Sequence, residues 1–169
     1  GSRGLWPRLV GLGAAALAAV SAILFVMIPF MADRGTDLIP PQAEVEFGRA
    51  SYERLASAMG LRECKSLDGD AALGQMQARL TEGLDLAYPL QIRVVNDPAV
   101  NAFALPGGQI AINRGLIDAA ETPEEVAAVL AHEIGHVVNR DSTRGALRSI
   151  GSFGIVGLVF GDALGTSAA

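Results

Sequence analysis

The stretch Ala131-His132-Glu133-Ile134-Gly135-His136 decides how the rest of the chain is interpreted. Its two histidines are four positions apart, and on an α-helix residues i and i+4 lie on the same face. Both imidazoles can therefore point at a single ion. Glu133 is turned by about 100° around the helix axis, so its carboxylate can reach a water on that ion without becoming a ligand. His132 and His136 are also the only histidines in the chain.

This H-E-x-x-H pattern is one in which two histidines bind Zn²⁺ and the glutamate deprotonates the metal-bound water. It predicts His132 and His136 as metal ligands and Glu133 as the catalytic base. The alternative is that all three are ordinary helix residues, with Glu133 a solvated charge. A zinc site of this class also needs a third protein ligand, which leaves the fourth position to water.

The residues before the motif predict the helix that carries it. Thr122 can cap the helix, Pro123 suits the first helical position, and Glu125 completes a capping box three residues after the cap. We expect the helix to run from Pro123 to about Arg140 or beyond. The motif then lies in the middle of a rigid element, as precise ligand placement requires.

Composition indicates one domain with a membrane segment attached. The chain has 169 residues, half of them apolar, and its mean hydropathy is +0.35. A net charge of −5 without a basic run argues against a nucleic-acid partner. The single cysteine, Cys64, rules out an intrachain disulfide. We interpret it as a packed residue, with a reactive thiol or a metal ligand as the alternatives.

An uncharged segment near the N-terminus predicts a membrane anchor. Leu9–Met31 spans 23 residues, about 34 Å of helix, which is enough to cross a hydrocarbon core of about 30 Å. We expect residues 9–31 to contact the lipid bilayer as a single-pass span; a cleaved signal peptide and a buried helix are the alternatives. Arg3 and Arg8 precede the span, so the positive-inside tendency places the remainder on the translocated, periplasmic side.

Pro40 and Pro41 mark the expected boundary between the anchor with its flanks, residues 1–37, and a globular part, residues 38–169. Two amphipathic helices are predicted first in the globular part, Gln42–Met59 and Asp70–Leu84. The apolar side of the first is expected to consist of Val45, Phe47, Leu55, Ala56 and Met59.

Three extended runs follow, at 90–95, 101–105 and 109–113. The Pro-Gly-Gly sequence between the last two predicts an antiparallel hairpin. Near the C-terminus, residues 150–160 are apolar and rich in glycine, but too short for a confident membrane span. They are interpreted as an interfacial segment, a segment packed on the core, or part of a loop.

Three stretches together resemble the membrane zinc endopeptidases of the HtpX, CAAX-prenyl-protease and Oma type, which are gluzincins. They are the apolar anchor, NAFALPGGQIAINRGLI at 101–117 and TPEEVAAVLAHEIGHVVNRD at 122–141. The resemblance implies an α+β fold: a mostly helical zincin-like domain with a small antiparallel sheet beside the active-site helix, preceded by a transmembrane helix. It also implies one Zn²⁺ per chain and a role in the quality control of membrane or envelope proteins.

The same resemblance implies a binding mode for the substrate. The extended stretch before the active-site helix forms a strand edge beside the zinc in this family. A polypeptide substrate would add to it as an extended strand. The residues of this chain that correspond are Asn101, Ala102, Phe103 and Ala104.

The chain departs from the family pattern at the third zinc ligand. Family members supply it as a glutamate on a later helix, in an E-x-x-x-D pattern, but no glutamate follows Glu133 here. Asp141 is expected to project from the same helix in the wrong geometry, and Asp162 lies in a glycine-rich apolar context. We expect the third ligand beyond Ala169, so that residues 38–169 form the N-terminal part of the peptidase domain. A catalytically inactive, peptidase-like binding or chaperone module and a purely structural tethered domain are the competing interpretations.

Overall fold

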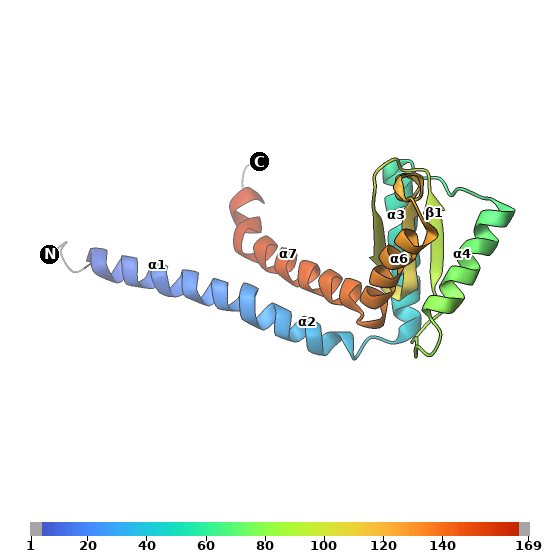
Figure 1. The fold of residues 1–169 in the computed structure, drawn as a ribbon. Helices are drawn as coiled ribbons and strands as arrows, with labels where there is room; N and C mark the ends of the chain where they lie inside the picture. Colours follow the sequence, from blue (N-terminus) through green and yellow to red (C-terminus); the bar gives the residue numbers. More distant parts are fainter. Residues whose placement is uncertain (1–4, 166–169) are drawn as a thin grey trace. The chain divides into compact units, whose positions relative to one another are not determined.

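A computed structural model describes residues 5–165 of the chain, with side-chain environments up to residue 154. Its contacts divide the described chain into two compact units (Figure 1). The first consists of the segment up to Leu38 together with the segment that starts at Arg144, and the second is Ile39–Thr143. The motif helix lies in the second unit.

The first unit begins with one long helix, Leu5–Thr36. It consists of α1 (Leu5–Ala22), a π-helical turn η2 (Ile23–Met27) and α2 (Ile28–Thr36). Its most apolar window has a mean hydropathy of 2.5 and is not buried. Within residues 5–165 it is the one helix long and apolar enough to cross a membrane, and it contains the span expected from the sequence.

Helix α7 (Asp141–Gly165) runs antiparallel to α2 within this unit. Arg148 donates a hydrogen bond to the carboxylate of Asp33 at 2.8 Å, and one further helical turn along α7, Gly151 lies against Ile28. The apolar, glycine-rich segment at 150–160 is therefore helical rather than a loop.

The second unit is built on a three-stranded sheet with the strand order β1-β3-β2. The strands are β1 (Gln91–Val95), β2 (Ala102–Leu105) and β3 (Gln109–Asn113). β2 and β3 form the predicted antiparallel hairpin around a short 3₁₀ turn, η3 (Pro106–Gly108). β1 pairs with β3 in parallel, so the sheet is mixed rather than wholly antiparallel. The reason is that the returning strand of the hairpin takes the central position, and this strand runs in the same direction as β1.

Helices cover both faces of the sheet, because successive residues of a strand point to opposite faces. Ile110 and Ile112 of β3 are buried on the face covered by α6 (Pro123–Val138) and α4 (Leu67–Leu80). Ala111 points to the other face, toward Tyr52 of α3. The motif helix α6 thus packs directly on the hairpin (Figure 1).

Helix α4 begins three residues earlier than the sequence predicted and ends at Leu80 rather than Leu84. Its start is set by Ser66, whose hydroxyl accepts a hydrogen bond from the backbone N–H of Gly69 at 3.2 Å. Asp68 and Asp70 add negative charge to the first turn, where the helix dipole favours it. A short helix α5 (Arg114–Ala119) connects β3 to the segment before α6.

Helix α3 (Pro41–Met59) begins one residue before the predicted start and ends at the predicted Met59, but part of its predicted apolar side is wrong. Phe47 and Met59 are exposed, and the buried residues of the helix are Glu44, Gly48 and Tyr52. Gly48 explains the orientation: a Cβ there would lie 1.7 Å from the carbonyl oxygen of Pro106, so only glycine lets the helix approach the η3 turn this closely. The spacing of apolar residues could not predict this buried face, because it is made of a glutamate, a glycine and a tyrosine.

The N-terminus of α6 also differs from the prediction. Thr122 occupies the cap position, but its side chain makes no capping hydrogen bond. The Glu125 carboxylate accepts from the backbone N–H of Glu121 at 2.9 Å, one residue before the cap. The helix does start at Pro123 as expected, while the reciprocal capping box is absent.

Candidate metal site on helix α6

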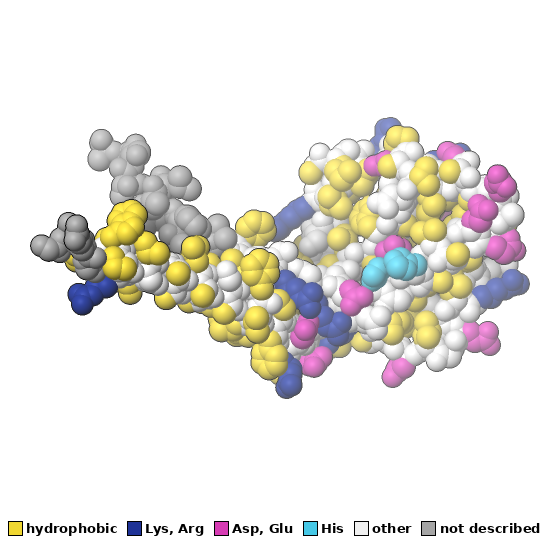
Figure 2. All heavy atoms as spheres, turned by 60° about the vertical axis from the view of Figure 1, so that its left-hand side comes forward, with side chains coloured by type: hydrophobic (Ala, Val, Ile, Leu, Met, Phe, Trp, Pro, Cys, Tyr) yellow, Lys and Arg dark blue, Asp and Glu magenta, His cyan; other side chains and the backbone are white. Residues whose placement is uncertain are grey.

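The two histidines of α6 converge on one side of the helix. Their ring centroids are 4.6 Å apart with an interplanar angle of 83°, and His132 Nε2 lies 3.1 Å from His136 Nε2. Since these are the only histidines in the chain, they make up the cyan patch in Figure 2, which is open to solvent and has acidic side chains next to it. The helical spacing therefore brings the two imidazoles together, as the sequence predicted.

The distance between the two Nε2 atoms fits a shared zinc ion. Zn–N bonds of about 2.0–2.1 Å at a tetrahedral angle place two ligating nitrogens roughly 3.3 Å apart. The observed 3.1 Å is close to that separation. In their separation, the two Nε2 atoms, which share a hydrogen bond in this structure, therefore fit two positions around one Zn²⁺.

Asp141 forms a hydrogen bond with His136 at Nδ1, the ring nitrogen that does not face His132. His136 Nδ1–H donates to Asp141 Oδ2 at 2.9 Å, so Nε2 keeps its lone pair for a metal. A carboxylate on the far nitrogen of a metal-binding histidine fixes both the tautomer and the ring orientation. Asp141 is thus no third ligand, and the sequence did not predict this second role.

The position of Asp141 depends on a turn that ends α6 earlier than expected. The helix stops at Val138, and Arg140 adopts a left-handed backbone conformation with φ of 56°. Among the described residues no other non-glycine residue has a positive φ. Asp141 then starts α7 instead of projecting from α6. A longer helix would have directed its carboxylate elsewhere.

Glu133 is almost buried on α6, with 9% of its surface exposed. Within the described part of the chain its carboxylate has no hydrogen-bond or ion-pair partner. A carboxylate in this environment is available to bind a water and to accept its proton. Its oxygens are not among the buried side-chain atoms that lack a partner in the described residues, so the carboxylate reaches solvent, as a group that activates a water must.

A third protein ligand does not lie near the two histidines in the described residues. Within these residues no group of three or more His, Cys, Asp or Glu side chains could hold a metal ion. Asp141 is engaged with the far nitrogen of His136, and the side chain of Asp162 lies outside the described environments. The described residues thus bring together two side chains that could hold a zinc ion, whereas a catalytic zinc site requires three protein ligands.

The stretch predicted to bind substrate forms the edge strand of the sheet. β2 pairs with β3 on one side only. Asn113 N–H donates to the carbonyl of Asn101 at 3.0 Å, so the backbone groups of Asn101 face the partner strand. In an antiparallel pair every second residue turns its backbone groups away from the partner strand. Phe103 therefore faces Ala111 of β3, whereas the backbone groups of Ala102 and Ala104 point outward.

One outward group of this edge is already used. The hydroxyl of Ser142 donates to the carbonyl of Ala104 at 2.8 Å. Ser142 directly follows Asp141, so this contact ties the edge strand to the segment that orients His136. Within residues 5–165, the outward groups of Ala102 and Ala104 without a hydrogen-bond partner are the N–H and C=O of Ala102 and the N–H of Ala104.

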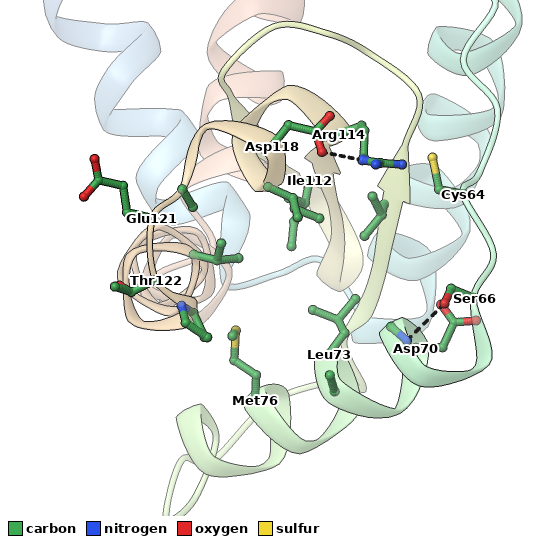
Figure 3. A pocket seen from close by; sticks show the side chains of 17 residues that line it. Cys64, Ser66, Asp70, Leu73, Met76, Ile112, Arg114, Asp118, Glu121 and Thr122 are labelled. Carbon is green, nitrogen blue, oxygen red and sulfur yellow. Dashed lines mark hydrogen bonds and ion pairs between the residues drawn. The ribbon is translucent and has the colours of Figure 1, made fainter.

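A cavity of ≈ 590 Å³ lies elsewhere in the second unit (Figure 3). Its apolar lining includes Leu73 and Met76 of α4 and Ile112 of β3, and Thr122 marks its position at the N-terminal end of α6. None of the three motif residues lines it. It is separate from the histidine pair, which lies on the surface about 15 Å further along α6 at 1.5 Å per residue.

Two imidazoles on one helical face with a nearly buried, unpaired carboxylate beside them are the arrangement that H-E-x-x-H metallopeptidases use. The model of peptidase family M48 matches residues 69–169 of the chain. The protein belongs to this family.

Several curated relatives to which the chain is similar are named as proteases. The chain is 42% identical over 60 residues to the mitochondrial metalloendopeptidase OMA1 of Arabidopsis thaliana, which is 36% of this chain and 12% of the relative. It is 40% identical over 60 residues to a putative beta-barrel assembly-enhancing protease of Vibrio cholerae, with the same shares covered. It is 42% identical over 82 residues to protease HtpX homolog 2 of Methanosarcina mazei, covering 46% of this chain and 26% of the relative. The chain thus matches only about an eighth to a quarter of the length of these relatives.

Proposed function

We propose that the protein is a membrane-anchored, zinc-dependent endopeptidase. The observation that carries the proposal is the 3.1 Å approach of His132 Nε2 to His136 Nε2 beside the nearly buried carboxylate of Glu133. Membership of peptidase family M48 supports peptide-bond hydrolysis as the reaction. The long apolar helix Leu5–Thr36 supports attachment to a bilayer.

In this proposal each residue of the site has a separate task. His132 and His136 hold Zn²⁺, and Asp141 fixes the orientation of the second imidazole. When bound, the ion polarises the scissile carbonyl and makes its water acidic. Glu133 takes the proton of the attacking water and passes it to the leaving amine.

The substrate is a polypeptide bound in an extended conformation along β2. The outward backbone groups of Ala102 and the N–H of Ala104 would pair with it, as in other cases of strand addition. Phe103 would contribute through the strand it stabilises, since its own backbone groups face β3. Asn101, whose carbonyl is engaged by Asn113, marks the beginning of the available edge.

The third zinc ligand is proposed to lie beyond Ala169, on a later helix of the peptidase domain. Asp141 binds the Nδ1 atom of His136 and so does not occupy the Nε2 position where the ion would lie. The globular part is proposed to lie on the translocated side of the membrane, with residues 9–31 as the span. A role in the quality control of membrane or envelope proteins fits an anchored protease of this kind.

The test is cleavage of casein or an unfolded membrane protein by the full-length protein and by its Glu133→Gln variant. We expect the rate to fall by about 10²–10⁴-fold, the usual contribution of a general base, while the zinc content stays at one per chain. Glu124→Gln, an exposed glutamate of the same helix, is the matched control and should cleave like the wild type. Unchanged cleavage by Glu133→Gln would remove Glu133 from the mechanism. A full-length protein without zinc would instead indicate a non-catalytic, peptidase-like binding module.

A further inference from the structure

A buried ion pair joins helix α3 to the turn after α6. The Glu44 side chain is 1% exposed and that of Arg140 20% exposed. Arg140 Nε donates to both carboxylate oxygens, at 3.2 and 3.0 Å, and Nη2 donates to Oε2 at 2.9 Å. Nη2 also donates to the carbonyl of Ile39 at 2.9 Å. The guanidinium therefore holds the beginning of α3 and the segment before it at once.

The surroundings of Glu44 are closely packed. Burial raises the pKa of the neighbouring Tyr88 hydroxyl, and the Glu44 carboxylate raises it further. A Cβ on Gly107 would lie 2.4 Å from the carbonyl oxygen of Glu44, so the η3 turn touches the helix backbone at this point. A buried ion pair adds little net stability compared with apolar residues of similar size. Its presence here calls for a reason other than stability.

The pair sits where the backbone is in its least ordinary conformation. Arg140 has a φ of 56°, a left-handed backbone conformation that residues other than glycine rarely adopt. The residue that follows is Asp141, whose carboxylate accepts the Nδ1 proton of His136 at 2.9 Å. The hydrogen bonds from Arg140 to Glu44 and Ile39 hold this left-handed residue in place. Because Asp141 follows directly, they also determine the position of Asp141 at the start of α7.

We propose that Glu44 is a positioning residue for the metal site: through Arg140 it fixes the turn between α6 and α7, so that Asp141 holds the His136 imidazole in the orientation and tautomer that Zn²⁺ binding needs. Glu44 touches neither histidine and acts only through the turn. The inference rests on the proposed function for its purpose, while the geometry it predicts can be measured without zinc.

The first measurement is the Zn²⁺ affinity of the full-length protein, by competition with a chromophoric chelator. We expect Glu44→Gln to weaken binding about tenfold, the lower end of what loss of an outer-shell partner costs. In an Asp141→Asn background the same substitution should change the affinity less than about twofold, because coupled residues are not additive. Glu53→Gln is the matched control: this residue pairs with Arg49 on the same helix at 2.9 Å but is exposed, and its loss should leave the affinity unchanged.

The second measurement is the tautomer of His136 in the metal-free protein, by ¹H–¹⁵N NMR of the imidazole nitrogens. The wild type and Glu53→Gln should carry the proton on Nδ1, whereas Glu44→Gln should show a mixture with the Nε2–H form. If Glu44→Gln does not fold, Arg140→Lys takes its place. It keeps a cation at the buried carboxylate but lacks the planar fork that binds two oxygens, and the same changes are expected.

The outcomes separate the two proposals. Lower stability with unchanged Zn²⁺ affinity and an unchanged tautomer would make Glu44 purely structural and overturn the inference. Equal losses in the wild-type and Asp141→Asn backgrounds would show that Glu44 does not act through Asp141. If the wild-type protein binds no Zn²⁺, the proposed function fails, and the tautomer alone then decides the inference.

Discussion

The two ends of helix α6 are held in different ways. At the N-terminal end Thr122 makes no side-chain cap, and Glu125 forms an exposed local bond to the N–H of Glu121. At the C-terminal end the chain turns through Arg140, which is bound to the buried carboxylate of Glu44 from a helix 96 positions earlier. One end depends on near neighbours in the sequence and the other on long-range buried contacts.

This difference matches the position of the histidines. His136 lies four positions before Arg140, whereas Thr122 lies about 15 Å before His132 at 1.5 Å per residue. The long-range contacts are thus concentrated at the end nearest the metal site. Changes at the C-terminal end should alter both the stability and the metal site, and changes at the N-terminal end should affect neither strongly.

The largest effect is expected from Gly48→Ala, which acts on the support of the C-terminal end. The added Cβ would lie 1.7 Å from the carbonyl oxygen of Pro106, a backbone atom that cannot move aside. Pushing α3 away from the η3 turn should lower the free energy of unfolding by about 3 kcal/mol, the cost of severe overpacking. It should also weaken Zn²⁺ binding, because Glu44 lies one turn earlier on the same face.

Urea denaturation of the Gly48→Ala variant checks this, with Gly74→Ala as the control. Gly74 is an exposed glycine in the interior of helix α4, and a Cβ there would meet nothing within 4 Å. Alanine should be neutral or stabilise this position by up to about 1 kcal/mol through helix propensity. A Gly48→Ala protein as stable as the control would show that the close packing of α3 is not required.

The sequence predicts the features of α6 that are local to one helix better than those that depend on distant contacts. Pro123 marks the start of α6, and the spacing of His132 and His136 determines that they meet, because both properties are local to one helix. The buried face of α3 could not be predicted in the same way. From the sequence alone Glu44 would be taken for a solvated charge. Its contact with Arg140, 96 positions later, exists only in the folded chain.

The same reasoning explains which features of the sheet and the site were missed. The Pro-Gly-Gly turn predicts the hairpin, since two extended runs flank it directly. The parallel pairing of β1 depends on which strand of the hairpin takes the centre, which no local pattern states. The orienting role of Asp141 depends on the left-handed conformation of Arg140, and a non-glycine residue gives no signal for it in the sequence.

An intermediate effect is expected from Asp141→Asn, which leaves the shape of the C-terminal end intact but removes its charge. Loss of the carboxylate on His136 Nδ1 should weaken Zn²⁺ binding about 10–100-fold, as for other outer-shell partners. Stability should change little, because the His136 and Asp141 side chains are both 42% exposed and neither is left buried without a partner. A chelator competition on the full-length protein measures this. The control is Asp118→Asn, which removes the carboxylate of an exposed pair with Arg114 and should leave binding unchanged. Equal affinities of the two variants would show that Asp141 does not tune the site.

The smallest effect is expected at the N-terminal end, from Thr122→Ala. Its hydroxyl makes no capping bond, so the free energy of unfolding should fall by less than about 0.5 kcal/mol, below the typical cost of losing a cap. Ser66→Ala is the informative partner, because the Ser66 hydroxyl does accept from Gly69 N–H and its loss should cost about 1 kcal/mol. Urea denaturation of both variants, with the Zn²⁺ affinity of each, measures the difference. If Thr122→Ala cost as much as Ser66→Ala or weakened Zn²⁺ binding, the start of α6 would also constrain the histidines, and the contrast between the two ends of the helix would not hold.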